Sequence, residues 1–142
     1  MKNSAAVVEY AGNDFFVATT PSGHALVLDS KGERSAAPGP LELLLVALGG
    51  CTAVDVVSIL EKKRQKVTKY HVEVRGERRE EHPRSFHRME VRHIVTGHAI
   101  DPEAVRRAIE LSTDKYCSVA ATLRPTVEIV SSFEVKETEV VS

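Results

Sequence analysis

The 142-residue sequence has few cysteines, almost no net charge and no apolar segment at its start. With 19 basic and 20 acidic residues, its formal net charge of −1 lacks the strong basic balance that indicates nucleic-acid binding. The opening residues, MKNSAAVVEYAGNDFF, contain no apolar core of a secretory signal. We therefore expect a cytoplasmic protein that binds no nucleic acid.

The two cysteines, Cys51 and Cys117, are too few for a disulfide scaffold. Neither has another Cys or a His at zinc-finger spacing, so the sequence predicts no metal site. The histidines are scattered over predicted strands and turns, and we interpret all six as structural or surface residues: His24, His71, His82, His87, His93 and His98. We find no repeat and no interdomain linker, and the length fits a single domain over residues 1–142.

The one long apolar run is LELLLVALGGCTAVDVVSIL, residues 41–60. Pro40 precedes it and a highly charged segment, EKKRQK, follows it, as suits the first and last turns of a helix. The run predicts a central helix over residues 40–65, about 39 Å long. Asp55 would cost about 3 kcal/mol inside a membrane. We therefore interpret the run as a buried helix of a soluble protein, without membrane association.

The remaining segments predict an α+β fold. Apolar alternation and turn residues divide the chain into four parts: β-meander and loop at 5–39, central helix at 40–65, β-hairpin, helix and strand at 66–135, and a frayed tail at 136–142. The meander strands are expected at 7–10, 15–19 and 25–28. The second helix begins after the N-cap Asp101 and is expected to end near Lys115.

A helix that is apolar on all sides needs protein all around it, and this short chain offers little to cover it. We therefore expect a homodimer whose subunits share their cores. Gly49 and Gly50, directly before Cys51, would let another backbone come close to the helix at that point.

The chemistry of the chain depends on its two thiols. A buried cysteine is usually a small hydrophobic residue, and this interpretation of Cys51 stays open. Cys117 follows an amphipathic helix at a polar break, where we expect it to be exposed. A redox pair is the alternative: one thiolate attacks a peroxide and becomes a sulfenic acid, and the second thiol condenses with it to a disulfide.

Ionisation of a thiol in apolar surroundings requires a nearby cation, and Arg34 in the loop before the helix is the candidate, with a surface loop role as the alternative. Glu42 is the nearest preceding carboxylate, but on one straight helix it would face away from Cys51. Asp55 lies one turn after Cys51 on the same face. It needs a hydrogen-bond partner in the core, or it opposes ionisation of the thiol.

Two segments, PLELL at residues 40–44 and ALGGCT at 47–52, resemble the central helix of the OsmC/Ohr family. This family contains osmotically inducible and organic-hydroperoxide-resistance proteins. The segment YCS around Cys117 resembles the family's second cysteine motif, and the element order fits over about residues 5–135. The resemblance implies an OsmC-like fold in an intertwined homodimer, in which sheets with strands of both chains wrap two central helices.

The resemblance also implies thiol-dependent reduction of organic hydroperoxides, with Cys51 as the peroxidatic and Cys117 as the resolving thiol. Arg34 and Glu42 are then the candidate activating residues, no cofactor is bound, and an external dithiol of the lipoyl type is the reductant. The chain has Leu41 where the Ohr branch has its Glu, and it has no Arg in the first hairpin turn. It therefore looks closest to a less characterised OsmC-like branch.

These differences motivate two alternatives. One is a non-catalytic dimer that binds an apolar ligand at the subunit interface. The other is a purely structural dimer with core cysteines.

Overall fold

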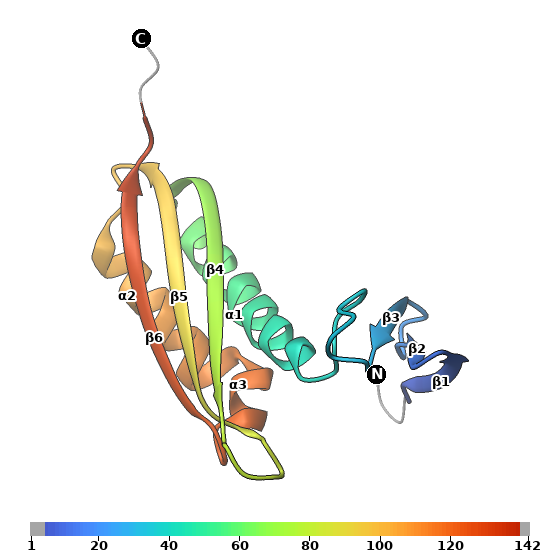
Figure 1. The fold of residues 1–142 in the computed structure, drawn as a ribbon. Helices are drawn as coiled ribbons and strands as arrows, with labels where there is room; N and C mark the ends of the chain where they lie inside the picture. The colour runs from blue at the N-terminus through green and yellow to red at the C-terminus, as the bar shows by residue number, and fades with distance from the viewer. Residues whose placement is uncertain (1–4, 140–142) are drawn as a thin grey trace. The chain divides into compact units, whose positions relative to one another are not determined.

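The structure, a computed structural model, describes residues 5–139. It contains two compact units, divided between Leu44 and Leu45, and each is described by itself. Figure 1 shows the elements of both units. The expectation of a single domain over residues 1–142 stays a prediction.

The first unit is an antiparallel sheet of three strands in sequence order: β1 (Val7–Gly12), β2 (Phe15–Thr19) and β3 (Ala25–Asp29). It confirms the predicted β-meander. Asn13 and Asp14 form the two-residue turn between β1 and β2, with φ values of 53° and 65°. Asn and Asp tolerate this left-handed region, which a tight hairpin turn requires.

The central helix α1 (Glu42–Lys62) confirms the predicted helix, with each end two or three residues inside the predicted bounds. Its fully buried larger side chains recur every four residues and form one face: Leu48, Thr52, Val56 and Leu60. On other faces, Val46 and Val54 are 67% and 71% exposed. Within one chain a single sheet layer covers one face of the helix, which agrees with the expectation that this short chain offers little to cover it.

By length and composition alone, α1 is long and apolar enough to cross a membrane. Core helices of soluble proteins meet the same criterion. The interpretation of this helix as part of a soluble protein stays a prediction.

The second unit contains a sheet in the order β4–β5–β6. Strands β4 (Lys66–Arg78) and β5 (Phe86–His98) form the predicted antiparallel hairpin. Strand β6 (Glu128–Glu137) pairs with β5 in parallel, as a helical crossover connection between them allows. Lys136 belongs to this strand rather than to the expected frayed tail, of which residues 140–142 lie outside the described residues.

Three helical segments connect β5 to β6. As predicted, Asp101 caps α2 (Pro102–Leu111), and its side chain accepts a hydrogen bond from the Glu103 N–H at 3.0 Å. A five-residue π-helical turn, η1 (Ser112–Tyr116), follows directly, so the α-helix ends earlier than predicted. The short helix α3 (Ser118–Leu123) is absent from our sequence prediction, because six residues are too few to show helical periodicity.

Figure 1 shows α1 and α2 on the same face of the β4–β5–β6 sheet. The core between these layers consists of buried apolar residues from all three and from the β5–α2 connection: Val56, Leu60, Val95, Ile100, Ala104, Val105, Ala108 and Ile109. Close packing also explains Gly49, where a Cβ atom would lie 3.1 Å from Val74 Cγ2. Side chains of β4, and not another backbone, therefore occupy the space that we expected this glycine to provide. A Cβ atom at Gly50 would meet nothing within 4 Å.

Candidate active site

The two cysteine sulfurs come together in the second unit. Cys51 lies on α1, next to the buried Thr52, and Cys117 follows the η1 turn. The two Sγ atoms and one carboxylate oxygen of Asp55 all lie within 4.8 Å of one another. Both thiols are free. A disulfide requires an S–S distance of about 2.05 Å, so the two sulfurs must move closer before they can join. The fold therefore pairs the thiols that the sequence analysis singled out.

The two thiols differ in their access to solvent. Cys51 is half-buried, whereas Cys117 is only 3% exposed, so our expectation that Cys117 is exposed is wrong. The η1 turn is the reason: it leaves Tyr116 52% exposed and turns the next residue inward. Burial raises the pKa of the Cys117 thiol to about 11, and the nearby Cys51 adds to this effect. The Ala120 N–H donates to Cys117 Sγ at 3.4 Å, and this hydrogen bond lowers the pKa of the thiol.

Asp55 has the core partner that its position requires. The Ser112 hydroxyl donates to Asp55 Oδ2 at 2.9 Å, and Ser112 Oγ lies 2.9 Å from Thr52 Oγ1. Ser112 is fully buried and Thr52 is 4% exposed. Sequence reasoning did not identify Ser112 as a site residue, although its small hydroxyl on the apolar stripe of α2 was a usable signal.

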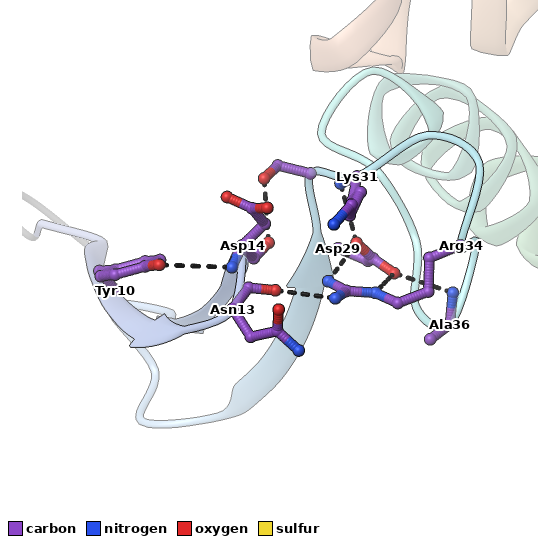
Figure 2. Close-up of polar contacts among 8 residues, drawn as sticks. Tyr10, Asn13, Asp14, Asp29, Lys31, Arg34 and Ala36 are labelled. Atoms are coloured by element: carbon purple, nitrogen blue, oxygen red, sulfur yellow. Dashed lines mark hydrogen bonds and ion pairs between the residues drawn. The ribbon is translucent and has the colours of Figure 1, made fainter.

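Arg34 lies in the first unit and is held by Asp29, as Figure 2 shows. Its Nε and Nη2 donate to the two carboxylate oxygens at 2.8 and 2.7 Å, and its Nη1 donates to the Asn13 carbonyl oxygen at 2.8 Å. The guanidinium also lies 3.8 Å from the Phe15 ring centroid. The ion pair lowers the pKa of Asp29 well below its ordinary value. Arg34 thus has the carboxylate partner that a partly buried arginine needs, and its action on Cys51 stays a prediction.

Glu42 is the first residue of α1. Its Oε2 accepts a hydrogen bond from the Gly39 N–H at 3.3 Å, so in this unit the side chain folds back on the preceding loop. This contact places a negative charge at the positive end of the helix dipole, which is a stabilising arrangement. An activating role of Glu42 toward Cys51 likewise stays a prediction.

A family model for OsmC-like proteins matches residues 31–132. The chain belongs to the OsmC-like protein family. It is 47% identical over 121 residues to Protein YhfA of Escherichia coli (strain K12), which covers 84% of this chain and 89% of YhfA. The structure of a hypothetical protein from Aquifex aeolicus VF5 matches with a TM-score of 0.86 and 34% identity, over 98% of this chain and 100% of that one.

An organic hydroperoxide resistance protein OsmC from Legionella pneumophila has a TM-score of 0.68 and 14% identity, with 95% of this chain and 98% of that chain covered. At this identity the likeness shows the fold alone. The comparisons confirm the expected OsmC-like fold, and they leave the roles of the individual site residues as predictions.

This OsmC-like protein also has a donor set that a metal ion could use. Thiolate sulfurs and a carboxylate oxygen are ligands that Zn²⁺ accepts, and Cys51, Asp55 and Cys117 supply three of them. The sequence did not reveal this set because Cys117 comes from a distant segment. The prediction of no bound metal stays a prediction.

One histidine lies in the core of the second unit. His93, on β5, is fully buried, and its Nδ1 lies 2.7 Å from the Tyr70 hydroxyl. Burial lowers its pKa to about 4, so the ring is neutral at pH 7. Its Nε2 has no hydrogen-bond partner among the described residues. This position agrees with the interpretation of His93 as a structural residue.

Proposed function

We propose that this protein is a thiol peroxidase that reduces organic hydroperoxides through a Cys51–Cys117 cycle. The observation that carries the proposal is the approach of the two sulfurs to within 4.8 Å, which brings together residues far apart in the sequence. The burial of Cys117 supports the assignment of roles, because the half-buried Cys51 is the thiol that a hydroperoxide meets first. Membership of the OsmC-like family is consistent with this chemistry.

The cycle has three steps. The Cys51 thiolate attacks the hydroperoxide oxygen that is distal to the organic group, and the products are a Cys51 sulfenic acid and an alcohol. The Cys117 sulfur then attacks the Cys51 sulfur, which forms the disulfide and releases water. An external dithiol, of the lipoyl type in our proposal, reduces the disulfide by thiol–disulfide exchange. Arg34 and Glu42 are the proposed activating residues, with the Arg34 charge favouring the Cys51 thiolate.

The proposed working form is a cytoplasmic homodimer that binds no nucleic acid. The apolar face of α1 supports a second subunit, since Val46, Val54 and Val57 are 67%, 71% and 38% exposed in the single chain. Large apolar side chains exposed together on one helix are typical of an interaction site in soluble proteins. A partner subunit also offers a way for residues of the first unit to complete the site.

The decisive experiment mixes reduced protein with cumene hydroperoxide and follows free thiols and alcohol formation. We expect wild-type protein to lose two thiols per chain, Cys51→Ser to lose none, and Cys117→Ser to stop at a sulfenic acid that a 1,3-dione reagent traps. Retention of both thiols by the wild-type protein would exclude the peroxidase.

The same apolar face supports a second candidate function, a non-catalytic dimer that binds an apolar ligand at its interface. This function predicts thiols that do not react with hydroperoxides and a melting temperature that rises with an added long-chain fatty acid. Reactive thiols and an unchanged melting temperature would rule it out.

A further inference from the structure

The carboxylate of Asp55 lies beside both thiols, and the proposed cycle gives it no role. One of its oxygens lies within 4.8 Å of both sulfur atoms. Asp55 is half-buried, and it lines a pocket of about 390 Å³ together with Lys62, Lys63 and Tyr116. The carboxylate therefore lies near both thiols and also beside a pocket that opens to solvent.

The hydrogen bonds at Asp55 have a defined direction. A serine hydroxyl has one proton, and that of Ser112 goes to Asp55 Oδ2. The bond between Thr52 and Ser112 must then run from the Thr52 hydroxyl to Ser112 Oγ. The chain of donors from Thr52 through Ser112 therefore ends on a carboxylate oxygen of Asp55. The hydrogen bonds in such a chain polarise and strengthen one another.

The same serine also fixes Cys117. The Cys117 backbone N–H donates to the Ser112 carbonyl oxygen at 2.7 Å and closes the η1 turn. The Ser112 backbone N–H in turn bonds to carbonyl oxygens of α2, at Ala108 and Ile109. One buried residue therefore anchors both the carboxylate of Asp55 and the backbone of Cys117, which keeps the two groups close.

The resolving step needs what this arrangement offers. Cys117 must lose its thiol proton before its sulfur can attack, yet burial raises the pKa of this thiol to about 11. With no assistance, only about one molecule in 10⁴ would hold the thiolate at pH 7, since each pKa unit is a factor of ten. A base close to Cys117 lowers this barrier by accepting the thiol proton as the sulfur attacks.

We propose that Asp55 is the general base that accepts the thiol proton of Cys117 as its sulfur attacks an activated Cys51 sulfur. This inference rests on the proposed function for its physiological substrate. In the cycle, the Cys117 S–H bond breaks, the S–S bond forms, the Cys51 S–O bond breaks and the departing hydroxide leaves as water after it takes a proton. The proton on Asp55 then passes to solvent through the pocket lined by the two lysines and Tyr116.

The test uses the aromatic disulfide DTNB, so that it does not depend on hydroperoxide chemistry. DTNB first forms a mixed disulfide at Cys51 and releases one thionitrobenzoate. Attack by Cys117 then releases the second thionitrobenzoate and leaves the Cys51–Cys117 disulfide, while the thiol proton goes to Asp55. We expect Asp55→Asn to slow the second release about 100-fold at pH 7, as for loss of a general base. A chelator is present throughout, so that no metal ion occupies the thiols.

The pH profile separates a base from a positioning residue. Asn keeps the oxygen that accepts the Ser112 bond, so Asp55→Asn retains the shape of the site. Its second release is expected to accelerate with rising pH and to approach the wild-type rate in alkali. Asp114→Asn is the matched control, because this carboxylate is exposed on η1, and it is expected to behave as wild type.

An unchanged second release in Asp55→Asn, or one slowed equally at all pH values, would overturn the inference. Wild-type protein provides a test that needs no variant. Its second release is expected to stay level between pH 9 and 6, whereas unassisted attack would fall tenfold per pH unit. A tenfold fall would overturn the inference as well. If the thiols do not react with cumene hydroperoxide but the DTNB results are as expected, the proposed peroxidase function is contradicted and the role of Asp55 is not.

Discussion

Asp29 and Asp55 are carboxylates in different units of the chain, and their partners differ in charge. Asp29 accepts two hydrogen bonds from the cationic Arg34 side chain, together with the backbone N–H groups of Lys31 and Ala36. The described side-chain hydrogen bond of Asp55 comes from the neutral Ser112 hydroxyl. A carboxylate paired with a guanidinium serves as a structural anchor, whereas the Asp55 carboxylate accepts from a neutral hydroxyl and lies beside two thiols.

The same contrast separates the buried polar groups of the two units. His93, like Asp55, has a hydroxyl as its partner, in this case that of Tyr70. The first unit therefore stabilises its buried carboxylate by charge pairing, and the second uses neutral hydroxyl groups. The comparison predicts that the two units respond differently to substitutions and to acid.

Substitution of Arg34 tests whether the residue that pairs with Asp29 also activates the Cys51 thiol. It has the largest expected effect. If Arg34 supports the Cys51 thiolate, Arg34→Gln slows oxidation of Cys51 by cumene hydroperoxide about 1000-fold, at the upper end of the loss for one electrostatic donor. The second thionitrobenzoate release is expected to stay unchanged. Stopped-flow measurement of thiol loss gives the first rate, and DTNB gives the second.

Lys31→Gln is the control, because it removes a cation from the same loop and leaves the two hydrogen bonds from Arg34 to Asp29 intact. Arg34→Lys keeps the charge but loses the two-pronged contact with Asp29, so an intermediate rate is expected. A lowered melting temperature in Arg34→Gln with an unchanged rate of Cys51 oxidation would show that the Arg34–Asp29 pair has a structural role alone.

Local sequence patterns sufficed to predict most elements of the fold. Alternation in the β4–β5 hairpin, the Asp101 cap and the length of the apolar run depend on neighbouring residues, and all three are confirmed. The same patterns indicated that α1 needs more cover than its own chain supplies. They could not show which face of α1 packs against the β4–β5–β6 sheet.

The candidate site was predictable only in part for a related reason. The thiol pair followed from the motifs around Cys51 and Cys117, whereas the Ser112–Asp55 bond joins residues 57 positions apart. Such a contact depends on how α1 packs against η1, which no local pattern encodes. The inward turn of Cys117 was missed because it depends on the π-helical geometry of η1.

Acid is expected to weaken the second unit through His93. Unfolded histidine takes a proton near pH 6.5, whereas the folded ring has its pKa lowered to about 4, so the unfolded state binds more protons in between. The neutral ring therefore contributes stability above pH 6.5, and this contribution is lost as pH falls toward 4. The expected loss is about 3 kcal/mol in the free energy of unfolding. Urea titrations between pH 7 and 4 measure it.

His93→Gln removes the titrating group and should flatten this pH dependence, although it lowers stability at pH 7. His87→Gln, at an exposed position of the same strand, is expected to keep the wild-type profile. The Asp29–Arg34 pair should persist over this range, because the pKa of Asp29 lies well below its ordinary value and the pair is lost only in stronger acid. At pH 4.5, β5 is expected to lose more hydrogen-exchange protection than β2. Equal losses in the two strands would contradict the expectation that acid weakens the second unit first.

The smallest expected effect belongs to Thr52, the first donor of the hydroxyl chain. Thr52→Val keeps a similar shape but removes the donor to Ser112 Oγ, while the Ser112 bond to Asp55 remains. The free energy of unfolding should fall by about 1 kcal/mol, as for one buried hydrogen bond. The second thionitrobenzoate release should stay within about threefold of the wild-type rate, because the Ser112 hydroxyl still holds the Asp55 carboxylate in place. Thr122→Val, which removes an exposed hydroxyl from α3, controls for the substitution itself. A loss of release as large as that expected for Asp55→Asn would place the proton acceptor on the hydroxyl chain and not on the carboxylate.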